Sequence, residues 1–142
     1  MMKIYLASNS KARKKLLEKF GLKFKVLPPK VRERKRRGNL SYAQLVKYNA
    51  CNKAKDVSAR VKEGIIIAAD TICVQEDKIF GKPGNISEAR RMLKKLSSKP
   101  QWLYTGLAVI KKGQGRDKLV SDYEKTRVYI CLLYTSPSPR DS

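Results

Sequence analysis

The chain of 142 residues contains no histidine, and its three cysteines are few and widely separated. Without histidine, neither a serine–histidine–aspartate triad nor a histidine general base is available. Cys51, Cys73 and Cys131 show no CxxC spacing, so a zinc site would lack its usual ligands. An odd number of separated thiols indicates reduced cysteines in a cytoplasmic protein.

Long hydrophobic runs are also absent. No apolar run approaches the roughly 18 to 20 residues that a membrane-spanning helix needs. The short apolar run near the N-terminus is followed by charge and not preceded by it, which is unlike a signal peptide. Hydrophobic residues make up 42% of the chain, enough to build a core, and the length suits one domain. We therefore expect a single folded domain outside the membrane.

Negative charge is scarce, with 12 acidic residues against 33 lysines and arginines and a net charge of +21. Such a surface attracts polyanions, whether nucleic acid, anionic lipid or nucleotide phosphates. The densest run, residues 30–37 (KVRERKRR), is either a nucleic-acid contact or a solvated basic loop. No RNA-binding signature or zinc finger accompanies it. Charge therefore indicates a class of partner and leaves the reaction open.

Hydrophobic periodicity and capping signals predict strands that alternate with helices. Strands are expected at residues 3–7, 24–27, 64–69, 102–110 and 118–130, with a hairpin joining 72–74 to 78–80. One helix is expected at residues 11–20, before a C-cap at Gly21. A second should begin at the capping box of Ser41 and Gln44. A third should begin at its cap, Ser87, and run through about residue 96, with an inner face of Ala89, Met92, Leu93 and Leu96. This pattern predicts an α/β domain with a mixed, twisted sheet flanked by helices.

The first candidate site lies before the first predicted helix, where Ser8 and Ser10 precede it and Arg13 falls in its first turn. The unpaired N–H groups of a helix N-terminus attract phosphate. Two hydroxyls and a guanidinium would add hydrogen bonds to the same group. The alternative is ordinary helix capping by serine.

The second candidate is Asp70, which comes directly after the apolar run 64–69. A carboxylate at the carboxyl end of an α/β strand points into the crevice where ligands bind. It could hold a divalent cation or accept a proton from water, or it could form an Asx turn. Lys82, in a Gly-Lys-Pro turn, could return to the same strand end through the predicted hairpin, or lie on an ordinary surface turn. The standard P-loop and dinucleotide fingerprints are absent.

Several short motifs follow one another in a set order. They are LASNSKARKKLL at residues 6–17, Glu33, Lys53-Ala54, Ala69-Asp70-Thr71, Gly81-Lys82-Pro83 with Glu88-Ala89 and Met92-Leu93, Tyr104-Thr105-Gly106, and Thr126-Arg127-Val128. In order and spacing they resemble the Maf family, whose opening motif reads L-A-S-x-S-P-R-R-x-x-L-L. The resemblance extends from residue 3 to residue 130 and implies the Maf/ITPase-like form of the α/β fold.

The resemblance also implies an activity, the hydrolysis of a nucleoside triphosphate to the monophosphate and pyrophosphate with Mg²⁺, Mn²⁺ or a similar divalent cation. It implies that Asp70 is the general base that activates water for attack at the α-phosphorus. Glu33 with Asp70 would bind the metal. The residues implied to bind the substrate are Ser8, Ser10, Arg13, Lys53, Thr71 and Lys82. Such in-line chemistry needs charge neutralisation and positioning more than covalent help, and it requires no histidine.

Thr71, next to Asp70, makes the sequence resemble the branch of the family that cleaves dTTP and UTP. Two departures count against that assignment, because Ala12 stands where this branch usually has an arginine and Lys11 replaces the usual proline. A homodimer is a further expectation from the family. Two other classes stay open, a basic nucleic-acid-binding module that uses residues 30–37 and a non-catalytic nucleotide sensor.

The last segment, residues 131–142 (CLLYTSPSPRDS), is rich in serine and proline and has no periodicity. Family members continue for about sixty more residues and carry a segment like D-K-A-G-x-Y-x-I-Q-G, and nothing of that kind follows Ile130. We therefore predict a Maf-like domain at residues 1–130 that is incomplete at its C-terminus, joined to a non-native tail at 131–142. The alternative is a natural flexible tail.

Overall fold

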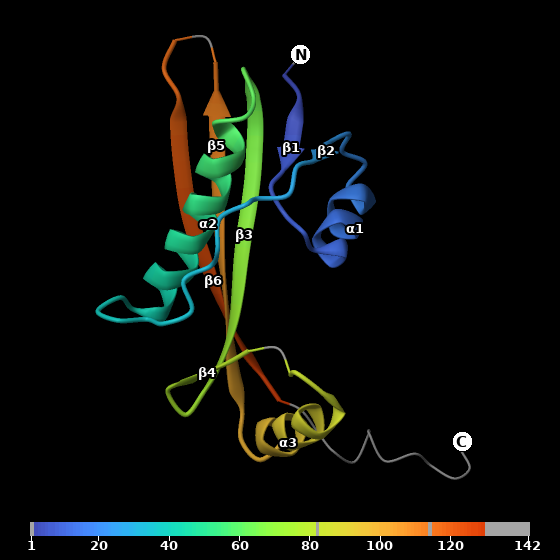
Figure 1. Ribbon diagram of the computed structural model, residues 1–142, viewed down its shortest axis with the longest axis vertical. Coiled ribbons are helices and arrows are strands. Elements are labelled where there is room, and N and C mark those ends of the chain that lie inside the picture. The colour runs from blue at the N-terminus through green and yellow to red at the C-terminus, as the bar shows by residue number, and fades with distance from the viewer. Residues whose placement is uncertain (1, 82, 114, 130–142) are drawn as a thin grey trace, which may run out of the picture. The chain divides into compact units, whose positions relative to one another are not determined.

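The computed structural model describes residues 2–81, 83–113 and 115–129 (Figure 1). Strands and helices follow one another in the order that the sequence predicts. The elements are β1 (Ile4–Leu6), α1 (Lys11–Lys19), β2 (Lys25–Val26), α2 (Tyr42–Ser58), β3 (Gly64–Gln75), β4 (Lys78–Phe80), α3 (Ile86–Leu96), β5 (Gln101–Lys112) and β6 (Lys118–Val128). In these residues no helix is both long and apolar enough to cross a membrane.

The strands form one six-stranded mixed sheet. Its order is β2-β1-β3-β5-β6, and β4 pairs with β3 off this path. Strand β1 is parallel to both neighbours, with Leu6 opposite Val26 and Ile67, whereas β3 and β4 are antiparallel. The predicted α/β class with a mixed sheet is confirmed.

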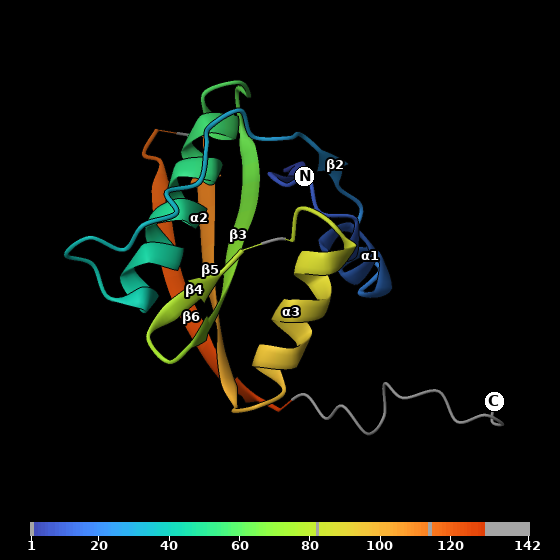
Figure 2. The ribbon, with the colours of Figure 1, turned by 60° about the horizontal axis from the view of Figure 1, so that its bottom comes forward.

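Contacts divide the described residues into two units, and the first contains residues 2–71, 105–113 and 115–124. In this unit, α2 packs on β3 and β5 through small and branched side chains (Figure 2). The buried core cluster consists of Ala7, Ala50, Ala54, Val57, Ile66, Ala68, Ala108 and Ile110. A Cβ atom at Gly106 would lie 2.3 Å from the backbone of Val46, so only glycine lets α2 approach β5 this closely.

The described residues of the second unit are 72–81, 83–104 and 125–129. Its β3–β4 hairpin turns through Glu76 and Asp77, whose φ angles of 51° and 62° match a two-residue type I′ turn. The predicted hairpin is confirmed. The buried Gln75 amide donates 3.0, 3.3 and 2.9 Å hydrogen bonds to the carbonyls of Lys95, Leu96 and Lys99, which binds the end of α3 to the strand.

Strand β3 runs through Asp70 to Gln75, so the prediction that Asp70 ends this strand is wrong. In the sequence, a polar residue after an apolar run suggests the end of a strand. In the structure β3 extends past Asp70 because it pairs with the neighbouring strand β5. The last residue of β3 that pairs with the parallel strand β1 is Ile67. Asp70 therefore lies beyond the carboxyl end of β1, where a ligand crevice is expected.

Helix boundaries differ from the prediction at one further place. The N-cap of α3 is Asn85, whose side chain accepts the Glu88 N–H at 2.8 Å, and Ser87 lies inside the helix. Of the predicted inner face only Leu96 is buried, and Leu93 is 44% exposed. The capping box of Ser41 and the left-handed Gly21 after α1 are confirmed, whereas Lys82 and residues 130–142 lie outside the described residues.

Candidate active site

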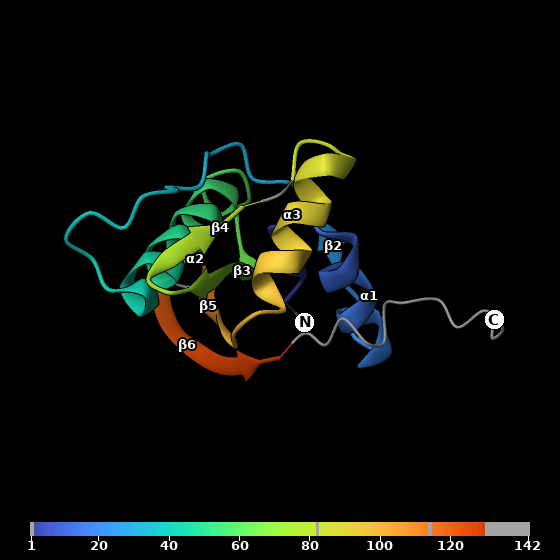
Figure 3. The same cartoon turned by 90° about the horizontal axis from the view of Figure 1, so that it is seen from below.

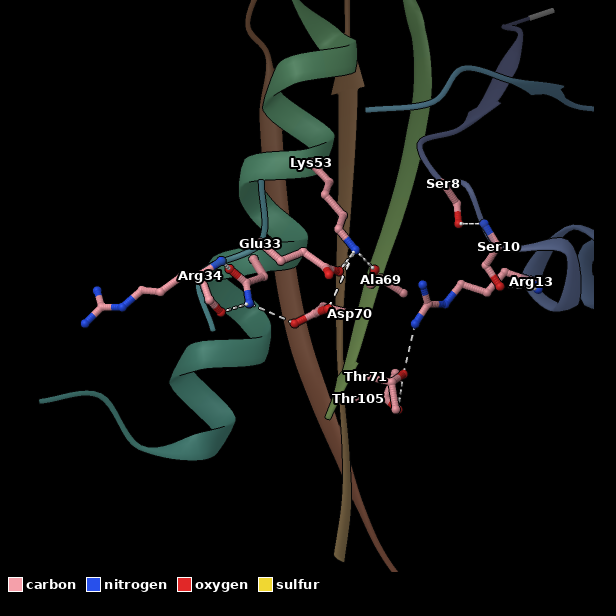
Figure 4. A network of polar contacts seen from close by, with 11 residues as sticks. Ser8, Ser10, Arg13, Glu33, Arg34, Lys53, Ala69, Asp70, Thr71 and Thr105 are labelled. Carbon is pink, nitrogen blue, oxygen red and sulfur yellow. Dashed lines mark hydrogen bonds and ion pairs between the residues drawn. The ribbon is translucent and has the colours of Figure 1, made fainter. Parts of the chain in front are cut away.

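Asp70 is buried in β3, with 4% of its surface exposed, and faces the polar side chains of α2 (Figure 4). The Lys53 ammonium lies 3.6 Å from the Asp70 carboxylate and donates a 3.2 Å hydrogen bond to the carbonyl of Ala69. It also donates to the Glu33 carboxylate. Lys53 is itself buried, and a buried ammonium is stable only when charges and acceptors surround it in this way. The structure therefore brings together Glu33, Lys53 and Asp70, as the family resemblance implies.

Asn49, one turn before Lys53 on α2, is a member of this cluster that the sequence reasoning missed. Its exposed fraction is 2%. Its amide nitrogen donates 2.9 Å hydrogen bonds to the Asp70 carboxylate and to the carbonyl of Arg34, and its oxygen accepts the Arg34 N–H at 2.9 Å. The sequence did contain an indication of this role, because Asn49 is a polar residue on the same face of the helix as the apolar Leu45 and Val46.

The basic segment at residues 30–37 runs along α2 and is bound to it through its backbone (Figure 2). The Lys30 N–H donates to Asp56 at 2.8 Å, and both polar backbone groups of Arg34 bond to Asn49. These contacts hold the neighbouring Glu33 beside Lys53. The segment therefore has a structural role in this site that neither sequence interpretation of the charge run included.

The pKa values of the two carboxyl groups, Glu33 and Asp70, are shifted in opposite directions. Burial and the hydrogen bond with Glu33 together raise the pKa of Asp70 to about 6, although the hydrogen bond of Asn49 and the charge of Lys53 act to lower it. The hydrogen bond with Asp70 lowers the pKa of Glu33 to about 2, with Lys53 acting in the same direction and burial opposing it. Near neutral pH, Glu33 is charged and Asp70 has a pKa suited to accepting a proton.

A second group of polar residues begins at the next residue of β3. The Arg13 guanidinium donates a 2.9 Å hydrogen bond to the hydroxyl of Thr71, which lies 3.0 Å from the hydroxyl of Thr105 (Figure 4). Asp70 and Thr71 are consecutive residues of β3, so their side chains point to opposite faces of the sheet, and the Lys53 ammonium and the Arg13 guanidinium reach the same stretch of the strand from different sides. Thr105 adds a partner to this group that was noted only as part of a strand motif.

Ser8 and Ser10 connect β1 to the start of α1. The Ser8 hydroxyl oxygen accepts the Ser10 N–H at 2.9 Å, and the Ser10 oxygen accepts the Arg13 N–H at 3.2 Å, so Ser10 is the N-cap. The capping interpretation is thus confirmed for Ser10. It does not exclude anion binding, because each hydroxyl still has its hydrogen to donate.

The site offers two carboxylates for a metal ion. Among the described residues, no group of three or more histidine, cysteine, aspartate or glutamate side chains could hold a metal. Mg²⁺ ordinarily takes one or two carboxylates and completes its shell with water and substrate phosphates. Glu33 and Asp70 fit that requirement, whereas a structural zinc site would need four ligands.

Comparisons with known proteins agree with this architecture. The sequence model of the family described as Maf-like protein matches residues 3–136. The chain is 42% identical over 132 residues to the dTTP/UTP pyrophosphatase of Carboxydothermus hydrogenoformans, covering 93% of this chain and 69% of that protein. It is 42% identical over 133 residues to the enzyme of the same name from Thermoanaerobacter pseudethanolicus, covering 93% and 68%.

Among solved structures, the Staphylococcus aureus Ham1 protein aligns with a TM-score of 0.53 at 14% identity, covering 89% of this chain and 71% of that one. At this identity the likeness concerns the fold alone, and it agrees with the predicted ITPase-like architecture. The family match and the identity to its relatives extend over most of the chain. The chain belongs to the family of Maf-like proteins.

Proposed function

We propose that this protein is a nucleoside triphosphate pyrophosphatase that acts on dTTP and UTP and releases the monophosphate and pyrophosphate. One observation carries the proposal. The buried Asp70, with its pKa raised to about 6, contacts Lys53 and adjoins the Arg13–Thr71 pair. A proton acceptor thus contacts one cation, and a second cation binds the next residue of the same strand, which suits water attack on a phosphate. Relatives named dTTP/UTP pyrophosphatase support the substrate class.

In the proposed reaction, Asp70 accepts a proton from a water molecule whose oxygen forms a bond to the α-phosphorus. The bond between the α-phosphorus and the bridging oxygen breaks, and pyrophosphate leaves with the electron pair. Asn49 and Lys53 hold the Asp70 carboxylate in one orientation through contacts of 2.9 and 3.6 Å. Proton acceptance therefore needs no rearrangement of this side chain, which is the benefit of a preorganised site.

The phosphate chain is proposed to bind at the start of α1. Arg13 and the hydroxyls of Ser8 and Ser10 supply donors there, in addition to the positive end of the helix. Thr71 is exposed and hydrogen-bonded to Arg13. Its side chain can therefore contact the substrate directly, beside the phosphates that Arg13 is proposed to bind. Lys82 is proposed as a further phosphate ligand from the motif alone.

Glu33 and Asp70 are the proposed ligands of Mg²⁺ or a similar divalent cation. When bound, such an ion neutralises the negative charge of the phosphate oxygens. Glu33 stays charged to low pH, because its pKa is lowered to about 2, and so it remains a ligand over the whole physiological range.

Phosphorus NMR tests the proposal, with Mg²⁺ and dTTP, UTP, CTP or 7-methyl-GTP in separate samples. We expect pyrophosphate and monophosphate from dTTP and UTP, and no product from Asp70→Asn. Circular dichroism of both proteins shows whether each is folded. Orthophosphate as the first product, or equal turnover by folded Asp70→Asn, would contradict the mechanism. Nucleotide binding without turnover by the folded wild type would favour the nucleotide sensor.

A further inference from the structure

Strands β5 and β6 are neighbours in the sheet (Figure 3). Outside the proposed active site, cations of the second unit lie over aromatic rings on these strands. The Lys125 ammonium lies 4.3 Å from the ring centre of Trp102 and 5.4 Å from that of Tyr104. The Arg127 guanidinium lies 5.7 Å from the ring centre of Trp102 and 5.2 Å from that of Tyr129. We call these five residues the cation–aromatic face.

Strand alternation separates this face from the acidic residues of β6. Successive side chains point to opposite faces of a sheet, so Lys125 and Arg127 share one face, and Tyr129, directly after the strand, lies against Arg127. Asp122 and Glu124 have the opposite parity and lie on the other face. The cation–aromatic face therefore carries positive charge that no carboxylate of β6 neutralises.

The outer members of the face are accessible. Lys125 and Arg127 are exposed, and Tyr129 is 67% exposed. Trp102 beneath them is half-buried, and its ring supports both cations. Since a cation held over an indole loses part of its side-chain freedom before a partner arrives, less entropy is lost on binding.

Exposed rings beside cations suit a polyanion whose own flat groups can stack. Single-stranded nucleic acid has both features, because its unpaired bases stack on aromatic and guanidinium planes while its phosphates bind lysine and arginine. A duplex hides the faces of its bases, and an anionic lipid surface has charge without rings. The chemistry therefore favours a single strand.

The basic segment at residues 30–37 is less suited to this role. The Arg34 guanidinium donates to the carbonyls of Arg36 and Arg37 at 2.8 and 3.2 Å, and Arg37 donates to the carbonyl of Leu40 at 3.3 Å. These guanidinium groups already bond to their own backbone. Arg32, Lys35 and Arg36 of this segment remain exposed. The cation–aromatic face is better suited because Lys125 and Arg127 both lie over the ring of Trp102.

We propose that the cation–aromatic face binds single-stranded nucleic acid. Bases stack on Tyr129 and on the guanidinium of Arg127, and the charges of Arg127 and Lys125 neutralise two phosphates of the backbone. This surface lies on residues other than those of the proposed active site, so the proposal is independent of the hydrolase activity.

Trp102 is the only tryptophan of the chain, so its fluorescence reports directly on this face. The full chain is titrated with an oligothymidylate of about 15 nucleotides that has a 5′-hydroxyl. We expect saturable quenching that excess dTTP does not reverse. With two phosphate contacts, the logarithm of the affinity should fall with that of the salt concentration with a slope of about −1.4.

Substitutions at the face then locate the binding. Tyr129→Ala should weaken binding roughly fivefold to hundredfold, the range for one lost base-stacking contact, whereas Tyr129→Phe keeps the ring and should bind like the wild type. Arg127→Ala should weaken binding and reduce the salt slope by about 0.7. Arg36→Ala is the matched control in the basic segment and should have no effect. Because Tyr129 and Arg127 are exposed, their loss removes no buried contact of the core.

Four results would overturn the proposal. The first is no quenching by the oligonucleotide. The second is binding that Arg36→Ala weakens and Tyr129→Ala does not, which would assign the contact to residues 30–37. The third is stronger quenching by phosphatidylserine vesicles than by the oligonucleotide, which would indicate a membrane surface. Duplex DNA of the same length should bind more weakly than the single strand, and tighter duplex binding would also exclude base stacking.

Discussion

Asn49→Ala removes three hydrogen bonds that join α2 to Asp70 and to the backbone of Arg34. No other described side chain of α2 except Lys53 has a hydrogen bond or ion pair with Asp70. After the substitution, the buried carboxylate keeps only Lys53 at 3.6 Å and its interaction with Glu33. The perturbation therefore acts on the orientation of Asp70 and on the segment that carries Glu33.

The magnitude of the loss follows from the three contacts. A buried group left without its partner costs about 1–3 kcal/mol, which applies to Asp70. The two polar backbone groups of Arg34 lie in an exposed segment and can bind water, so each bond contributes about 0.5–1.5 kcal/mol. The sum is about 2–6 kcal/mol of unfolding free energy. Since the Asn49 hydrogen bond lowers the pKa of Asp70, its removal should also move that pKa upward from about 6.

Urea denaturation and a pH–rate profile measure these two effects. Asn52→Ala is the matched control, because Asn52 is half-buried on the same helix and the hydrogen bond and ion pair described for Asp70 involve Asn49 and Lys53 instead. We expect Asn49→Ala to unfold at a lower urea concentration than the control. As the pH is lowered, its activity should begin to fall at a higher pH than that of the control. If both alanine variants had the same unfolding free energy and the same acidic limb, the role assigned to Asn49 would be wrong.

Three further predictions follow from the same geometry. Turnover by the wild type should fall about tenfold per pH unit below pH 6, because protonated Asp70 cannot accept a proton; a profile flat down to pH 5 would exclude it as the base. Gly106→Ala should lower the unfolding free energy by about 1–3 kcal/mol, because the new methyl group overlaps the Val46 backbone. Gly81→Ala is the control, because Gly81 has open space around it, and this variant should melt like the wild type when followed by circular dichroism. Lys53→Ala should reduce kcat/KM at least a hundredfold at saturating Mg²⁺, since it removes the cation beside Asp70, and full activity in this variant would refute that role.

Local signals in the sequence were sufficient for most of the fold. The capping box at Ser41 and the two-residue turn at Glu76 and Asp77 depend on atoms within a few residues, so pattern alone identifies them. Local reading failed at Asp70, where β3 continues because β5 pairs beside it. It failed again at the start of α3, where Asn85 and Ser87 are both good caps and the observed helix uses the first.

The order of short motifs, from Ser8 to Arg127, determined the family and the identity of most candidate site residues. Only the tertiary structure decided how these residues act on one another. Arg13 meets Thr71 across 58 positions of sequence, and Asn49 meets Asp70 across 21. The raised pKa of Asp70 arises mainly from burial. Burial and long-range hydrogen bonds depend on how distant segments pack, and no pattern within a few residues carries that information.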